Sequence, residues 1–78
     1  MSHPLEQEIA AIWADVLGLE RVGPQDDFTD LGGNSLHAMR IISSVEELID
    51  AELSLRVLLE TRTVAGMAER IDAMRAGE

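Results

Sequence analysis

The chain has 78 residues, no cysteine and no lysine, and its 15 acidic and 6 basic side chains give a formal charge of −9. A chain of this length forms one domain, here residues 1–78, and without cysteine it has neither a disulfide nor a thiolate metal site. The acidic balance argues against binding to nucleic acid or to an anionic membrane, and no apolar run approaches the ~18 residues of a membrane span.

The first helix is predicted to run from Pro4 to a stop at Gly18. Proline suits the first turn of a helix, and glycine is favoured just after the last turn. Between them, apolar residues recur at helical spacing and form one stripe, which consists of Leu5, Ile9, Ile12, Trp13, Val16 and Leu17. We expect Trp13, the single tryptophan, in the core or at its edge.

Residues 18–34 form a long connection that is rich in glycine, proline and aspartate. A connection of this length in a small domain is usually functional, or held by its own side chains. The side chains predicted to hold it are Leu19, Val22, Phe28 and Leu31. Residues 26–28 are predicted to form one short helical turn, and the ligand pattern of a calcium-binding loop is missing.

The second helix is predicted to start near Ser35. At about 100° per residue, one arc of this helix gathers the expected core residues, which are Ala38, Ile41, Ile42, Val45, Leu48 and Ile49. Leu36 and Met39 fall outside this arc, and Arg40 lies almost opposite it. Exposed apolar residues beside an exposed hydroxyl indicate a docking face, although single exposed Leu or Met residues are also common on surfaces.

Two further helices complete the chain. Ser54 is predicted to cap a short helix over Leu55 to Leu59, whose expected core contacts are Leu55, Leu58 and Leu59. Thr63 is predicted to cap the last helix, whose apolar positions are Val64, Met67, Ala68, Ile71 and Met74, and residues 76–78 are expected to fray. The resulting prediction is an all-α fold, a small four-helix bundle with three longer helices, a short third helix and a long loop between helices 1 and 2.

The residues from Asp30 to Leu36 read Asp-Leu-Gly-Gly-Asn-Ser-Leu and place the hydroxyl of Ser35 at the start of a helix. A phosphate-binding P-loop would need a lysine after the glycines. Ser35 and His37 diverge by about 200° on a helix and therefore do not form a catalytic pair. Two histidines without cysteine do not make a zinc site. We therefore expect that the domain is not an enzyme by itself.

Ser35 is instead predicted to be modified by another protein, and its position suits a phosphate ester. The first N–H groups of a helix lack internal partners, and the helix dipole adds partial positive charge there. Gly32 and Gly33 permit positive φ and remove bulk where a modifying enzyme must approach. From spacing alone an alternative stays open, in which Asn34 or Ser35 merely caps a helix after a glycine turn.

Asp27-Phe28 together with Asp30 to Leu36 resembles the phosphopantetheine attachment motif of carrier proteins. The double glycine is closer to the peptidyl carrier (thiolation) domains of nonribosomal peptide synthetases than to the acyl carriers of fatty-acid synthesis. Residues 12–17, 52–56 and 63–68 resemble, in order, segments of the first, third and fourth helices of this family. The chain departs from common family residues at Asn34 (often His or Asp), Ser54 (Pro), Leu59 (Phe) and Arg62 (Pro).

The resemblance implies that a phosphopantetheinyl transferase, using coenzyme A and Mg²⁺, attaches a 4′-phosphopantetheine arm to the Ser35 oxygen. The thiol of the arm would carry an aminoacyl or other acyl group as a thioester. An adenylating enzyme would load it, and condensation, tailoring or thioesterase enzymes would use it. In this family the partners contact the loop before the serine and the start of the second helix, which here corresponds to Asn34, Leu36, Met39 and Arg40.

Two alternatives to the peptidyl carrier remain at this point. One is a carrier of polyketide or fatty-acid chains, against which the double glycine and Trp13 weigh. The other is a helical interaction module that is never modified at Ser35. In each case we expect a monomer, and because the first residues lack the shape of a signal peptide, we expect it in the cytoplasm.

Overall fold

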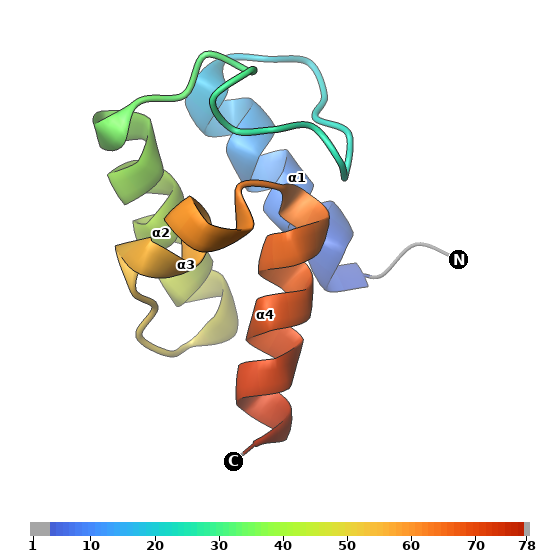
Figure 1. The fold of residues 1–78 in the computed structure, drawn as a ribbon, viewed down its shortest axis with the longest axis vertical. Helices are drawn as coiled ribbons and strands as arrows, with labels where there is room; N and C mark the ends of the chain where they lie inside the picture. Colours follow the sequence, from blue (N-terminus) through green and yellow to red (C-terminus); the bar gives the residue numbers. More distant parts are fainter. Residues whose placement is uncertain (1–3, 78) are drawn as a thin grey trace.

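The computed structural model describes residues 4–77, which form four helices joined by loops and contain no strand. The helices are α1 (Pro4–Leu17), α2 (Ser35–Ile49), α3 (Leu55–Thr61) and α4 (Val64–Ala76). In Figure 1 the loop after α1 crosses the top of the bundle, and the short α3 lies in front between α2 and α4. This arrangement confirms the predicted all-α fold class. None of the helices within residues 4–77 combines the length and apolar character needed to cross a membrane.

The helices pack in a ring around one aliphatic core. α1 contacts α2 and α4, and α3 contacts the same two helices from the opposite side (Figure 1). The largest fully buried side chains come from all four helices and are Ile9, Trp13, Ile41, Val45, Leu58, Val64, Met67 and Ile71. The core therefore depends on hydrophobic contacts between helices, because the sequence offers no disulfide.

Both ends of α1 lie where the sequence signals place them. The helix begins at Pro4 and ends at Leu17, and Gly18 follows with a φ of 71°. The N–H of Gly18 donates to the carbonyl of Asp15 (3.3 Å) and the N–H of Leu19 to that of Ala14 (2.8 Å). This pair of bonds is a Schellman motif, which needs a residue that tolerates positive φ. The predicted stripe of α1 faces the core, with Trp13 fully buried.

The sequence predicts the core face of α2 correctly except at Leu48. Ala38, Ile41, Ile42 and Val45 are buried, and Ile49 packs against the core as a half-buried residue. Leu48 is exposed, because it lies at the edge of the predicted arc in the last turn of the helix. A similar error affects Met74 of α4, which is exposed because the last turn of α4 projects beyond the other helices (Figure 1).

The predicted core contacts of the third helix are largely wrong. Ser54 caps α3 as expected, with its hydroxyl accepting from the N–H of Arg56 at 3.1 Å. Of the three expected contacts only Leu58 is buried, whereas Leu55 and Leu59 are exposed and Leu53 and Val57 are buried instead. At about 100° per residue, the apolar residues of this short helix span an arc of about 200°, which is wider than the face that the core covers, so periodicity did not identify which of them are buried.

The end of the chain agrees with the sequence except at the last helical residue. The hydroxyl of Thr63 accepts from the N–H of Gly66 at 3.0 Å and caps α4, as predicted. Val64, Met67, Ala68 and Ile71 are buried along one face of that helix. Ala76, predicted to fray, is still helical, and its successor Gly77 ends α4. Glu78 lies outside the described residues.

Candidate functional site

Ser35 is the first residue of α2, and its side chain is exposed. Asn34, which precedes it, is the N-cap: its Oδ1 accepts from the N–H of His37 at 3.1 Å. The N–H of Asn34 donates in return to Nδ1 of His37 at 3.3 Å. These two bonds form a capping box, so His37 interacts with Asn34 rather than with Ser35. The sequence left open which residue caps the helix, and the structure assigns that role to Asn34.

The start of α2 leaves backbone donors available beside the Ser35 hydroxyl. The N–H of His37 is capped by Asn34, and the N–H of Ala38 donates to the carbonyl of Asn34 at 2.9 Å. Within residues 4–77, the N–H groups of Ser35 and Leu36 have no protein acceptor. They point into the region where the helix dipole favours negative charge. An exposed hydroxyl with two such donors fits a phosphodiester.

The loop before Ser35 is shaped by a turn that begins at Asp27. Its Oδ1 accepts from the N–H groups of Thr29 (2.8 Å) and Asp30 (3.4 Å), and its carbonyl accepts from Leu31 (3.1 Å). The turn therefore covers residues 28–32. The sequence analysis predicted this turn at residues 26–28, which is two residues too early. Asp27 was expected within the turn, but it precedes the turn and caps it with its carboxylate. Asp26 acts in the preceding bend, where its Oδ2 accepts from the N–H of Gly23 at 2.8 Å.

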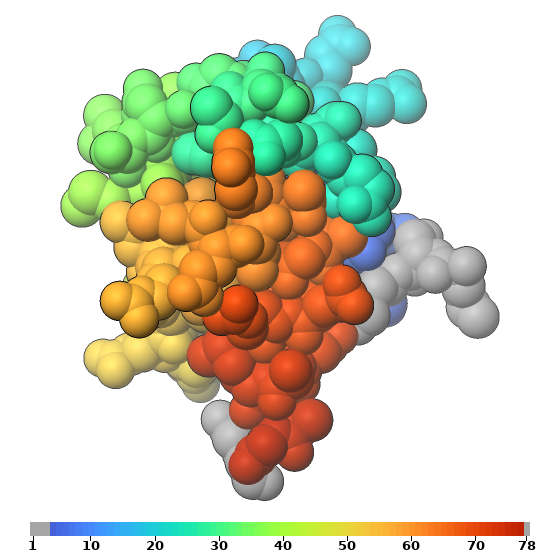
Figure 2. Space-filling model, in the orientation of Figure 1, coloured from blue at the N-terminus to red at the C-terminus, as the bar shows by residue number. Residues whose placement is uncertain are grey.

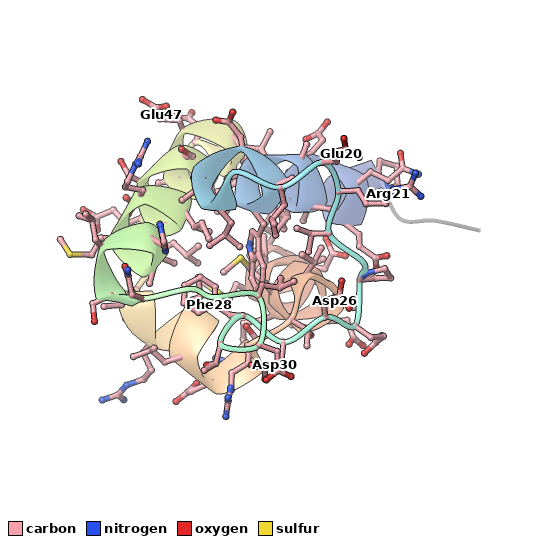
Figure 3. The ribbon with its side chains drawn as sticks, turned by 90° about the horizontal axis from the view of Figure 1, so that it is seen from above. Glu20, Arg21, Asp26, Phe28, Asp30 and Glu47 are labelled. Carbon is pink, nitrogen blue, oxygen red and sulfur yellow. The ribbon has the colours of Figure 1, made fainter. Side chains whose placement is uncertain are left out.

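Phe28 connects this turn to the core. Its side chain is buried and points inward in Figure 3, whereas Asp30 lies on the outer side of the loop. The ring meets Trp13 edge to face, with centroids 5.5 Å apart and an interplanar angle of 79°. Trp13 is fully buried, and its indole N–H has no hydrogen-bond acceptor within the described chain. Phe28 thus fixes the loop against the centre of the bundle.

The two glycines before Asn34 serve different needs. Gly32 has a φ of 88°, so it adopts the positive φ that the sequence analysis expected a glycine to permit. Gly33 instead lies directly over the ring of Phe28, where a Cβ would overlap the ring carbons. Its N–H donates to the carbonyl of Phe28 at 3.0 Å. Gly33 is therefore needed for close packing on Phe28, in addition to its predicted role of leaving room for a modifying enzyme.

Of the other side chains predicted to hold the loop, Val22 is buried and Leu31 packs half-buried against the core. Leu19 is exposed, so that part of the prediction is wrong. Its backbone rather than its side chain is used, in the motif that ends α1. Among the four apolar side chains predicted to hold the loop, Val22, Phe28 and Leu31 therefore do so.

A contact that sequence reasoning missed joins this loop to the α3–α4 junction. The guanidinium of Arg62 binds the carboxylate of Asp27, with Nε 3.1 Å from Oδ2 and Nη2 3.2 Å from Oδ1. Figure 2 shows the orange surface of this junction lying against the green surface of the loop. The partners are 35 residues apart, so no local pattern indicates the pair. Arg62 has a φ of 59°, which a proline ring excludes, although the resembled family commonly has proline here.

The surroundings of Asp27 change its acidity. Partial burial raises the pKa of this carboxyl, but the N–H groups of Thr29 and Asp30 and the positive charge of Arg62 outweigh that effect. The net result is a pKa below the usual range of an aspartate. Asp27 is therefore a carboxylate at neutral pH, which keeps both the turn and the ion pair in place.

The predicted docking residues all lie on the surface at the start of α2. Leu36 and Met39 are 65% and 60% exposed, and Arg40 is exposed on the same helix. Asn34 is also exposed, but its side-chain oxygen is occupied by the cap. The structure therefore leaves Leu36, Met39 and Arg40 accessible beside Ser35, and gives Asn34 a structural role as well.

Comparison with known proteins identifies the class to which this site belongs. Residues 7–71 match the family model described as "Phosphopantetheine attachment site". Among curated proteins, gramicidin S synthase 2 of Brevibacillus brevis is 52% identical over 68 residues, which are 87% of this chain and 2% of the synthase. Tyrocidine synthase 3 of Brevibacillus parabrevis is 44% identical over 72 residues, which are 92% of this chain and 1% of that synthase. The chain thus spans only a small part of these curated relatives.

Solved structures show the same similarity. BlmI, a type-II acyl-carrier protein of Streptomyces verticillus involved in bleomycin biosynthesis, is 64% identical with a TM-score of 0.89, and the match covers 90% of this chain and 84% of BlmI. A peptidyl carrier protein, solved in complex with the phosphopantetheine transferase Sfp and coenzyme A, is 32% identical with a TM-score of 0.87. That match covers 94% of this chain and 95% of the other.

The chain belongs to the phosphopantetheine attachment family, whose members are non-catalytic carriers modified by a phosphopantetheinyl transferase. Within that family it is a carrier domain homologous to the peptidyl carriers of nonribosomal peptide synthetases. The group that such a domain holds is 4′-phosphopantetheine. The geometry at the start of α2 fits this group, because an exposed hydroxyl and two free N–H groups lie together there.

Proposed function

We propose that Ser35 is the residue to which the 4′-phosphopantetheine arm is attached, within a carrier domain that comprises residues 1–78. The observation that supports this most directly is the position of Ser35, an exposed serine at the first residue of α2. The unpartnered N–H groups of Ser35 and Leu36 suit the charge of a phosphodiester. Bound there, the arm supplies a terminal thiol for a thioester.

The attachment reaction needs only an accessible oxygen from this chain. The Ser35 oxygen bonds to the pantetheine-bearing phosphorus of coenzyme A, the diphosphate bond breaks, and adenosine 3′,5′-bisphosphate leaves. A base of the transferase takes the hydroxyl proton. Because His37 is held in the capping box with Asn34, no side-chain base among residues 4–77 is hydrogen-bonded to Ser35. The domain is accordingly proposed to be a substrate of the transferase and to have no catalytic activity of its own.

We further propose that partner enzymes dock on Asn34, Leu36, Met39 and Arg40. The exposure of Leu36 and Met39 beside Ser35 supports this surface, because two large apolar side chains there are not needed by the core. Partners must leave after each step, and a small patch suits weak, fast binding. Asn34 would contribute mainly by holding the backbone of the patch through its cap.

The proposed partners are a phosphopantetheinyl transferase, an adenylating enzyme that loads the arm, and condensation, tailoring or thioesterase enzymes that use the cargo. Similar carriers have been solved with the transferase Sfp and in an A-PCP structure, that of McyG, complexed with phenylalanyl-adenylate. We propose that the domain acts as a monomer in the cytoplasm. A loading assay distinguishes the two kinds of carrier. A peptidyl carrier is loaded by an adenylating enzyme, whereas a polyketide or fatty-acid carrier is loaded by acyl or malonyl transfer.

Intact-protein mass spectrometry tests the attachment site. The purified chain is incubated with coenzyme A, Mg²⁺ and a promiscuous phosphopantetheinyl transferase. We expect one phosphopantetheinyl group on the wild type and on the control Ser43→Ala, which removes another exposed serine of α2. The Ser35→Ala variant should gain none. An adduct that persists in Ser35→Ala, or no adduct on the wild type, would reject the proposal.

A further inference from the structure

Arg62 holds the loop before Ser35 through its main chain. It follows the last residue of α3 in the left-handed region, with a φ of 59°, and its N–H donates to the carbonyl of Leu58 at 2.8 Å. Its own carbonyl accepts from the N–H of Phe28 at 2.8 Å. A second main-chain bond nearby, from the N–H of Ala65 to the carbonyl of Pro24 at 2.9 Å, joins the same two segments. The α3–α4 junction and the loop are therefore tied together at two points.

The side chain of Arg62 adds contacts on both sides of Phe28. Its guanidinium binds both carboxylate oxygens of Asp27, at 3.1 and 3.2 Å, and Nη2 lies 3.3 Å from the hydroxyl of Thr29. The Asp27 side chain is 28% exposed and that of Arg62 is 54% exposed, so the pair is partly shielded from water. A guanidinium that binds both oxygens fixes direction as well as distance, unlike a point charge.

These contacts lead to Ser35 by a short route. The carboxylate that Arg62 binds also caps the turn over residues 28–32. The residue between the two bound side chains, Phe28, lies beneath Gly33 and accepts its N–H. Gly33 is followed by the cap Asn34 and then by Ser35. The position of the α2 start relative to the bundle thus depends on residues 27–29, which Arg62 holds.

We propose that Arg62 is a positioning residue for Ser35: it holds residues 27–29 in the arrangement that presents the Ser35 hydroxyl to the transferase. This inference rests on the proposed function of Ser35. Another exposed ion pair, Arg70 with Glu60 at 3.0 Å, joins α3 to α4 and involves no residue of the loop. It therefore supplies a matched control, since Arg62→Gln and Arg70→Gln each remove one exposed guanidinium from a carboxylate.

Amide hydrogen exchange tests the structural half of the inference. The N–H groups of Phe28, Leu31 and Gly33 are hydrogen-bonded within the loop or to Arg62, so their exchange reports opening of the loop. In Arg62→Gln we expect them to exchange about two- to fivefold faster, the range for a partly exposed ion pair. Amides in the middle of α1 and α4 should keep their rates, and Arg70→Gln should leave the loop amides unchanged.

Transferase kinetics test the functional half. A loosened loop must be ordered when the transferase binds, so in Arg62→Gln we expect KM to rise by about the factor seen in exchange, with kcat kept. Arg62→Lys should recover only part of the loss, because one ammonium cannot hold both oxygens of Asp27 and the Thr29 hydroxyl. A general loss of stability would instead speed exchange throughout the bundle.

The possible outcomes separate this inference from the proposed function. If the wild type is not modified at Ser35, the proposed function fails whatever the exchange data show. If the wild type is modified but Arg62→Gln leaves the loop amides at wild-type rates, Arg62 does not hold the loop and the inference is overturned. It is equally overturned if the loop amides speed up while KM stays the same, or if Arg70→Gln raises KM as much.

Discussion

Gly33 shows how closely the fold controls the approach to Ser35. Its missing side chain leaves room for the ring of Phe28, which is itself packed edge to face against Trp13. The ring cannot move away without losing that contact, because both aromatic side chains are buried. Packing against the buried Phe28 ring therefore restricts position 33, two residues before the proposed attachment site, to glycine.

We predict that Gly33→Ala destabilises the domain by about 1–3 kcal/mol, the range for overpacking a well-packed core. Urea or thermal unfolding measures the effect. Gly77→Ala is the control, because a Cβ there meets only ordinary contacts at 3.6 and 3.7 Å, so we expect a change within about 0.5 kcal/mol. Equal midpoints for the two variants would contradict the close packing of Gly33 on Phe28.

Asp27 gives the loop a defined dependence on pH. Its folded pKa is lowered, so the stabilisation from its charged form is present above the unfolded pKa and is lost as pH falls through the folded value. The groups around it are Arg62, the N–H groups of Thr29 and Asp30, and the flanking carboxyl of Asp26. The turn should therefore be unchanged from neutral pH to about pH 5 and loosen below about pH 4.

Carboxyl-carbon NMR titration measures this prediction. The midpoint for Asp27 should fall below the usual range of an aspartate, and Arg62→Gln should raise it by removing the nearby positive charge. The N–H donors of the turn remain in that variant, so the rise should be partial. A midpoint at or above the usual range in the wild type would show that the contacts around Asp27 do not favour its charged form.

At the scale of the helix, one face of α2 packs against the core and another face is proposed to bind partner enzymes. Ile42 is buried against the core, whereas Met39, three residues earlier, is 60% exposed. Ile42→Asp should unfold the domain, because an unpaired buried charge costs several kcal/mol, comparable with the whole free energy of unfolding. Met39→Asp should keep the helix content measured by circular dichroism but slow transfer from at least one partner enzyme. If both variants unfold equally, the assignment of faces is wrong.

The start of α2 depends on its cap. Asn34→Ala removes the acceptor for the N–H of His37 and should cost about 0.5–2 kcal/mol, measured by thermal unfolding. Asn34→Asp keeps an acceptor at the same place and should stay near the wild-type midpoint. If the alanine and aspartate variants melt alike, the capping box does not stabilise the helix.

The elements differ in how well the sequence predicts them, for physical reasons. Helix ends are predicted well, because they depend on the conformation and hydrogen bonding of a few consecutive residues. The residues that mark them here are Pro4, Gly18, Ser54 and Thr63. Burial is harder to predict where a helix is short or projects from the bundle, as in α3 and at Met74. In α3 the apolar residues span about half of the helix circumference, and packing against α2 and α4 selects Val57 and Leu58 among them.

At the scale of the whole molecule, the site combines local and distant parts. The exposed serine and its glycine-rich approach could be read from seven consecutive residues, because a helix start is a local structure. The contact of Arg62 with Asp27 and Thr29 could not, since it forms only when segments 35 and 33 residues apart meet in the folded chain. The loop that crosses the top of the bundle in Figure 1 is therefore held by the α3–α4 junction, which is distant from it in sequence.

The edge-to-face contact of Trp13 with Phe28 has a practical consequence. Trp13 is the single tryptophan of the chain, so its intrinsic fluorescence comes from one known place, next to the ring that supports Gly33. A buried indole emits at shorter wavelength than one in water, so a red shift reports detachment of the loop from the core. The domain thus contains its own optical reporter, which permits stopped-flow measurements on the unlabelled protein.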